Sequence, residues 1–225
     1  MLWVMNSFPR KITSLILKVV IVVTATSGVV IQYVLDPRDM LFFTAQSNLW
    51  IAVACLAGII LILTHAPVQR WLFSVKLALT VAITLTGIIY CTVLAPFMGA
   101  KAYTPQAVLL HVVVPVAAVA DFLVYDCCVG YRKWECLTVT IPPLCYLIFA
   151  GVGYLQNWDF GYGGHNYPYF FLNWGNPAGA FGFSAEFPFI GVCYYILILL
   201  ALVIGLGALY IAIANRLAHR QQKNK

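Results

Sequence analysis

Six long apolar runs, separated by short polar segments, account for most of this sequence of 225 residues. They cover residues 14–35, 42–63, 72–94, 106–125, 136–155 and 189–215. Each is long enough to cross a bilayer as an α-helix, which takes about 20 residues. Only 9% of the residues are charged, whereas a soluble domain carries about 25%. We therefore predict one all-α domain over residues 1–225, a polytopic integral membrane protein built as a six-transmembrane-helix bundle.

The basic residues support this count and predict an orientation. With the N-terminus in the cytoplasm, the outer segments carry only Arg38 and Lys101. The inner segments then carry Arg10, Lys11, Lys18, Arg70, Lys76, Arg132, Lys133, Arg216, Arg220, Lys223 and Lys225. Such a bias follows the positive-inside rule, so we predict that both termini are cytoplasmic. Because the basic residues lie at span ends, the net charge of +6 does not indicate nucleic acid as a partner.

The segment 156–188, between the fifth and sixth runs, is rich in Gly, Pro and aromatic residues and contains no Lys or Arg. The predicted topology puts it outside. Two interpretations are open. It is either an interfacial loop whose Trp and Tyr lie at headgroup level, or a cap over a cavity, where irregular backbone is shielded by protein.

Polar side chains gather at the start of the second run, in Thr44-Ala45-Gln46-Ser47-Asn48. Thr44, Ser47 and Asn48 lie at i, i+3 and i+4, on one helix face. Residues of these types commonly join helices within membranes by hydrogen bonds, and that is one interpretation of the cluster. The other is a site inside the bundle.

The fourth run contains His111, about six residues in from its outer end, and Asp121 nearer the cytoplasm. An ionisable residue within a span is a functional hypothesis by default, although a neutral histidine satisfied by a neighbour is the alternative. Pro115 lacks an N–H and clashes with the carbonyl of His111, so we predict a kink there. For Asp121 we expect a supporting ion pair with Lys76 rather than a direct catalytic role.

Thr44 and His111 are predicted at similar depth in the outer leaflet, since both spans run from outside to inside. A hydroxyl and an imidazole within reach of each other make a nucleophile and a general base. Thr80, Thr84, Thr86 and Tyr90 add a polar stripe to the third run. It either lines the same interior or bonds to its own helix backbone.

Nothing in the sequence indicates a cofactor or a metal. The seven cysteines have no metal-ligand spacing, and the four histidines fall at different levels of the membrane. Nucleotide-binding loops and an HExxH pattern are absent from the sequence. We predict neither a cofactor nor a metal site, and the sequence does not indicate an oligomeric state.

Three short motifs resemble a known group of enzymes. They are Phe43-Thr44-Ala45-Gln46-Ser47-Asn48, Leu109-Leu110-His111 with Pro115, and the stretch from Tyr167 to Asn173. In order and polarity they are similar to androgen-induced-protein-type membrane threonine hydrolases, which cleave fatty acid esters of hydroxy fatty acids, and to their bacterial six-span relatives of unassigned function. The resemblance implies a bacterial plasma membrane, Thr44 as nucleophile, His111 as base, and Asp121 as the aspartate that follows the histidine.

From residues and resemblance together we expect an intramembrane lipid-ester hydrolase, with membrane lipids or lipid-like esters as its partners. Its transition state needs donors to an oxyanion, for which Gln46, Ser47, Asn48 and the more distant Asn173 are candidates. Two other functions are open. The chain could be a small-molecule or lipid transporter, which needs polar residues along a route between both faces, or a non-catalytic lipid-binding protein.

Overall fold

The computed structural model describes residues 8–161 and 163–223. It contains six helical spans that are long and apolar enough to cross a membrane: Pro9–Leu35, Phe43–Leu63, Arg70–Met98, Pro105–Cys128, Glu135–Leu155 and Val192–Arg220. Each boundary lies within five residues of the boundary predicted from the sequence. The prediction of an all-α, six-span integral membrane protein is therefore confirmed.

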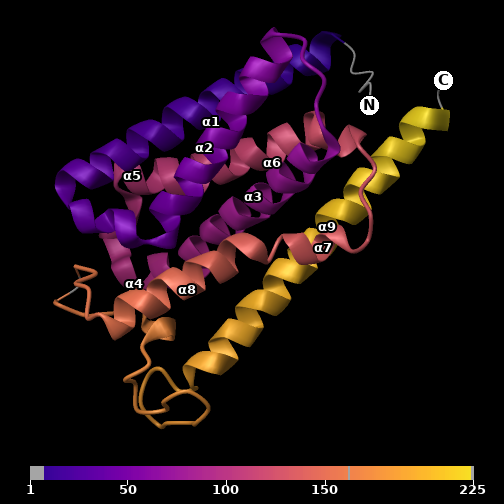
Figure 1. Cartoon of the computed structure of the whole chain (residues 1–225). Coiled ribbons are helices and arrows are strands. Elements are labelled where there is room, and N and C mark those ends of the chain that lie inside the picture. The colour runs from indigo at the N-terminus through magenta and orange to yellow at the C-terminus, as the bar shows by residue number, and fades with distance from the viewer. Residues whose placement is uncertain (1–7, 162, 224–225) are drawn as a thin grey trace.

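The spans are made of the following elements, shown in Figure 1. Helices α1 (Phe8–Leu35) and α2 (Phe43–Leu63) are joined by η1 (Pro37–Leu41). The third span comprises α3 (Arg70–Ile89), η2 (Tyr90–Leu94) and α4 (Ala95–Met98), and η3 (Gly99–Tyr103) follows it. The fourth comprises α5 (Pro105–Val108), η4 (Leu109–Val113) and α6 (Val114–Val124), and η5 (Asp126–Cys128) follows. The fifth comprises α7 (Glu135–Thr138) and α8 (Ile141–Leu155), and the sixth is α9 (Val192–Lys223).

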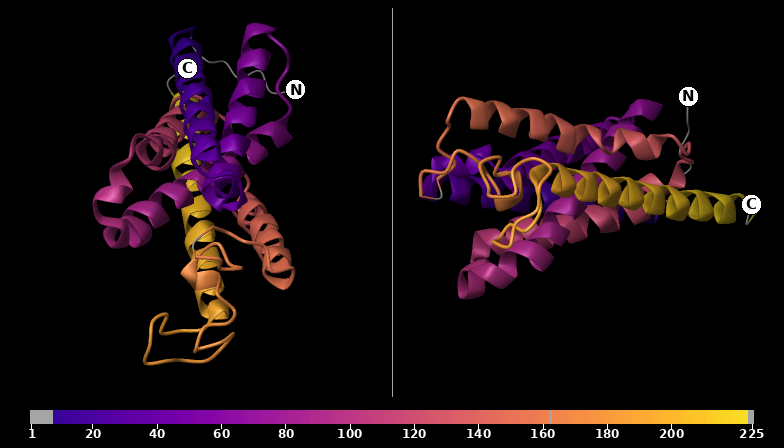
Figure 2. Two further views of the ribbon diagram at one scale, coloured as in Figure 1. Left: turned by 90° about the vertical axis from the view of Figure 1, so that its left-hand side faces the viewer. Right: turned by 90° about the horizontal axis from the view of Figure 1, so that it is seen from below.

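The start of α1 and the end of α9 lie at one end of the bundle, and the segment between α8 and α9 lies at the other (Figures 1 and 2). We call these the terminal end and the loop end. Helices α1, α2, α3 and α6 pack together, and α3 also packs against α8 and α9. The third span is thus central to the bundle, as its burial also indicates.

A dry layer lies in the middle of the bundle, between α1, α2, α3 and α6. Its largest side chains are Ile21, Ile51, Ile83 and Val114, each fully buried. Apolar side chains also cover the outside of the spans, as a bilayer requires. Between these four helices the dry layer separates the polar groups around Asp121 from those around Thr44. Beside it, Thr84 Oγ1 of α3 lies 2.9 Å from the Tyr210 hydroxyl of α9.

A buried ion cluster holds α1, α3 and α6 together toward the terminal end. The Asp121 carboxylate accepts hydrogen bonds from Lys18 Nζ at 2.8 and 2.9 Å, from Lys76 Nζ at 2.8 Å and from Ser14 Oγ at 2.6 Å. Lys76 also lies 3.6 Å from Asp126. The predicted pair of Asp121 with Lys76 is present, and Lys18 joins it. Burial of charges is tolerable because each has a bonded partner.

We predict that Asp121→Asn destabilises the fold by about 3–5 kcal/mol, because the change leaves two buried lysines without their shared carboxylate. Thermal unfolding in detergent measures the effect. Asp159→Asn is the control, since it removes the same charge from an exposed ion pair with Arg38. Equal melting temperatures for the two variants would contradict a structural role of the cluster.

Candidate active site

The backbone around His111 is a π-helical turn, η4, set between two α-helical segments. The N–H of Val114 bonds to the carbonyl of Leu109, five residues back. Pro115 follows directly, and it has no N–H to give to the carbonyl of His111. A π turn within an α-helix accommodates such an interruption and is frequent at functional sites. The helix is thus irregular, with a π turn, directly before the position where a kink was predicted.

A second π-helical turn, η2, lies in the third span and carries Tyr90. The N–H of Ala95 bonds to the carbonyl of Tyr90, five residues back. The Tyr90 ring stacks on the His111 imidazole, with centroids 3.6 Å apart and planes inclined by 15°. The Tyr90 hydroxyl donates to the carbonyl of Ala102 at 2.7 Å. Tyr90 therefore fixes the plane of the imidazole, a role that its place in a polar stripe did not reveal.

Gly87 of α3 lets the third span approach the fourth beside His111. A Cβ atom at this position would lie 3.0 Å from the backbone oxygen of His111 and 3.2 Å from the Pro115 ring. Both neighbours belong to stiff backbone structure, so neither moves aside as a flexible side chain would. The absence of a side chain at Gly87 is thus part of how the site is assembled.

Thr44 and His111 are in contact. Thr44 Oγ1 lies 3.2 Å from His111 Nε2, and His111 Nδ1 lies 2.9 Å from the carbonyl oxygen of Ala107. A carbonyl only accepts hydrogen bonds, so in this arrangement Nδ1 carries the proton. In the neutral imidazole Nε2 is then the acceptor, and the Thr44 hydroxyl donates to it. Both residues are buried, and their geometry is that of a nucleophile and its general base.

Thr44 lies in the first turn of α2, which begins at Phe43. The first intrahelical bond at this end runs from the N–H of Gln46 to the carbonyl of Phe42, and no side chain caps the helix. Within the described part of the chain, the N–H groups of Thr44 and Ala45 have no acceptor. Free N–H groups at a helix start are suitable donors to a developing negative charge. The donors to an oxyanion that were predicted from the sequence are all side chains, so these backbone groups were not among them.

Asn48 and Ser47 hold the backbone of Thr44 in place. Asn48 Nδ2 donates to the carbonyl of Thr44 at 2.8 Å and to that of Leu110 at 3.3 Å. Ser47 Oγ donates to the carbonyl of Thr44 at 3.2 Å and lies 3.0 Å from Thr86 Oγ1. These contacts join α2 to η4 and to α3. The polar cluster was interpreted either as hydrogen bonding between helices or as a site inside the bundle. Both apply, because the hydrogen bonds between helices hold Thr44 at the site.

The remaining predicted oxyanion donors lie farther out. Gln46 Nε2 donates to the carbonyl of Met40 at 3.4 Å. Asn173, in the loop, accepts a hydrogen bond from the N–H of Gly175 at 3.0 Å, and it lines neither of the cavities that contain Thr44. The structure brings Thr44, His111, Ser47 and Asn48 together and leaves Asn173 apart. Asp121 belongs to the ion cluster, on the far side of the dry layer.

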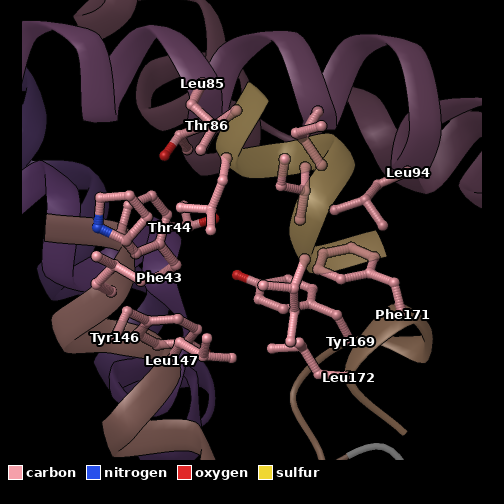
Figure 3. A pocket seen from close by; sticks show the side chains of 16 residues that line it. Phe43, Thr44, Leu85, Thr86, Leu94, Tyr146, Leu147, Tyr169, Phe171 and Leu172 are labelled. Atoms are coloured by element: carbon pink, nitrogen blue, oxygen red, sulfur yellow. The ribbon is translucent and has the colours of Figure 1, made fainter. Parts of the chain in front are cut away.

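Two cavities meet at Thr44. The first, which we call the crevice, is an apolar space of about 90 Å³ between α2, α3, α8 and α9. In Figure 3 the side chains that line it point toward one another, with those of Thr44 and Thr86 among them. The second, which we call the chamber, has a volume of about 570 Å³ and lies at the loop end. It also contains His111 in its lining, so both members of the pair are accessible from it.

The loop covers the chamber. Tyr167, Pro168, Tyr169, Phe170 and Phe187 form part of its wall. An ion pair of 2.6 Å between Arg38 and Asp159 ties the loop to η1. Hydrogen bonds from the N–H of Gly161 and from Arg38 keep the pKa of Asp159 below its ordinary value, so the carboxylate is charged at neutral pH.

In residues 8–161 and 163–223, His, Cys, Asp and Glu side chains form no group of three or more that could hold a metal ion. Comparison of the chain with protein-family models, with curated proteins and with solved structures finds no match.

We predict that Gly87→Ala lowers stability by about 1–3 kcal/mol, because the added methyl group overpacks the contact between α3 and η4. Thermal unfolding measures the loss. Gly151→Ala on α8 is the matched control, since a Cβ there meets nothing within 4 Å. If Gly87→Ala is as stable as the control, the close approach of the two spans is not needed for packing.

Proposed function

We propose that this protein is an integral membrane hydrolase of lipid esters, with Thr44 as nucleophile and His111 as general base. The observation that carries the proposal is the buried contact between Thr44 Oγ1 and His111 Nε2, made with Nδ1 bonded to a carbonyl. The contact lies where an apolar crevice meets a larger chamber. The resemblance to androgen-induced-protein-type hydrolases independently implies the same two residues.

In the first half of the reaction, His111 Nε2 accepts the proton of the Thr44 hydroxyl while Oγ1 bonds to the ester carbonyl carbon. The N–H groups of Thr44 and Ala45 donate to the oxyanion that forms. When this intermediate collapses, the bond to the alcohol oxygen breaks and His111 returns the proton to that oxygen. The products are a free alcohol and an acyl group on Thr44.

In the second half, water attacks the acyl carbon and His111 Nε2 accepts one of its protons. The bond between the acyl carbon and Thr44 Oγ1 breaks, and His111 gives the proton back to Oγ1. The fatty acid leaves and the enzyme is restored. Throughout, the hydrogen bond from Nδ1 to the carbonyl of Ala107 keeps Nε2 directed at Thr44.

The two cavities suggest how such an ester would lie. The crevice is lined by apolar residues of α8 and α9, such as Leu147 and Leu199, and would accept the acyl chain. The chamber would hold the alcohol part and the attacking water. A substrate dissolved in the membrane reaches a crevice between spans without leaving the lipid.

The distribution of Lys and Arg supports an orientation with both termini in the cytoplasm. The loop end, with Thr44 and His111, then lies in the outer leaflet. The resemblance to bacterial six-span proteins suggests the plasma membrane of a bacterium as the location.

The dry layer favours a hydrolase over a transporter. A transporter needs a polar route through the membrane. Here Ile21, Ile51, Ile83 and Val114 are fully buried between the Thr44 site and the Asp121 cluster. A non-catalytic lipid-binding protein would share the same cavities and is distinguished by experiment.

We predict that an alkyl fluorophosphonate labels the purified protein, and that mass spectrometry finds the adduct on Thr44. Thr44→Ala and His111→Ala should abolish labelling, because the first lacks the nucleophilic oxygen and the second lacks the base. Thr44→Ser, which keeps a hydroxyl, should retain labelling.

Thr92→Ala is the matched control. Thr92 belongs to η2 near the same end of the bundle, but its side chain is exposed and bonds to the carbonyl of Ile88. It should label like the wild type. Folded wild-type protein that is not labelled, or that is labelled as strongly after Thr44→Ala, would contradict the proposed hydrolase and favour the lipid-binding alternative.

A further inference from the structure

The chamber has a distinctive lining. Besides Tyr90, six aromatic side chains contribute to it: Phe42, Phe97, Tyr167, Tyr169, Phe170 and Phe187. One carboxylate, that of Asp39, lies among them, and the described lining contains no Lys or Arg. Aromatic faces carry partial negative charge, so these rings and the Asp39 carboxylate give the lining several groups that attract a cation.

Asp39 is a carboxylate without a counter-ion in contact. It lies in η1 and is half-buried. In the part of the chain that the structure describes, no hydrogen bond or ion pair reaches its side chain. Burial, together with the charge of Asp36, raises the pKa of Asp39 above its ordinary value. A ligand with positive charge would relieve this cost.

The neighbouring Arg38 does not serve as that counter-ion. Its guanidinium donates to Asp36 at 2.8–3.2 Å and to Asp159 at 2.6 Å. Asp36, Arg38 and Asp159 thus form an exposed group with a net charge of −1, from −2 and +1, and Asp39 of the chamber lining adds a negative charge next to Arg38 in the chain. The field in the chamber favours a cation over an anion.

A second acceptor in the chamber is also unused. The Oε1 atom of Gln32, in α1, is buried and has no hydrogen-bond donor among the described residues. Buried polar atoms are normally satisfied by protein, water or ligand. The Asp39 carboxylate and Gln32 Oε1 are thus two acceptors of the chamber that are suited to a ligand with donors or positive charge.

We propose that the chamber binds an alkylated ammonium group carried by the alcohol part of a lipid ester. A poorly hydrated cation gains from contact with several aromatic faces and from the Asp39 carboxylate, the combination that recognises quaternary ammonium groups. An ester whose alcohol part ends in a free carboxylate would be repelled by Asp39. Assigning the ammonium to a substrate rests on the proposed hydrolase function, whereas binding of the ammonium does not.

Calorimetric titration of the wild-type protein in maltoside micelles tests the proposal, with ligands that contain no ester bond and so cannot be hydrolysed. The probe is decyltrimethylammonium, and it is compared with two ligands of similar length. One is 2,2-dimethyldodecane, in which carbon replaces the nitrogen, and the other is decanoate. We expect the ammonium probe to bind more tightly than either, and Asp39→Asn to weaken it by roughly fivefold to tenfold while leaving the uncharged ligand unaffected.

Glu186→Gln is the matched control, because Glu186 is an exposed loop carboxylate that does not line the chamber. It should leave the affinity for decyltrimethylammonium unchanged. Equal binding of the uncharged ligand, or no effect of Asp39→Asn, would overturn the proposal. Choline chloride competing as effectively as the long-chain probe would assign the chamber to a soluble cation and contradict the lipid assignment.

The two proposals fail separately. Selective ammonium binding in a protein whose Thr44 is not labelled by fluorophosphonate would leave the chamber assignment intact and remove the hydrolase. Labelling of Thr44 in a protein that binds the ammonium probe no more tightly than the uncharged ligand would support the hydrolase and remove the chamber assignment.

Discussion

Pro115 interrupts the hydrogen bonding of the fourth span, because it has no N–H to give to the carbonyl of His111. Backbone groups inside a bilayer must be satisfied within the protein. Just before Pro115 the span takes a π turn, in which the N–H of Val114 bonds to the carbonyl of Leu109. The turn fixes where the imidazole of His111 lies, with Nδ1 on the carbonyl of Ala107 and Nε2 toward Thr44. The stacked ring of Tyr90 comes from a second π turn, so backbone irregularity in two neighbouring spans builds the site.

The rest of the bundle holds this arrangement rigid. The ion cluster around Asp121 ties α1, α3 and α6 together toward the terminal end, and Ser47 and Asn48 tie α2 to its neighbours toward the loop end. Between them the dry layer excludes polar contacts. The proposed nucleophile and base would need positions accurate to about half an ångström, and two separate sets of buried hydrogen bonds hold the helices that carry them. The chamber differs from these helix contacts, because residues of the loop between α8 and α9 form part of its wall.

Much of the fold was predictable because bilayer thickness makes the length of an apolar run decisive. Depth along a span was equally informative: it paired Asp121 with Lys76 and put the hydroxyl and the imidazole at one level. Other features depend on rotation and register, which depth does not give. Lys18 looked like an inner-end cation, yet it enters the ion cluster. Tyr90 reaches the imidazole only through a π turn, and Asn48, predicted as an oxyanion donor, bonds to backbone carbonyls instead.

The central claim is that Thr44 forms a covalent intermediate with the acyl part of an ester. An experimental structure of the protein after reaction with a long-chain phosphonate ester tests it most directly, since phosphorus imitates the tetrahedral carbon. The account predicts phosphorus bonded to Thr44 Oγ1, an oxygen within hydrogen-bond distance of the N–H groups of Thr44 and Ala45, and the alkyl chain in the crevice. An unmodified Thr44, or a Thr44 apart from His111, would contradict it.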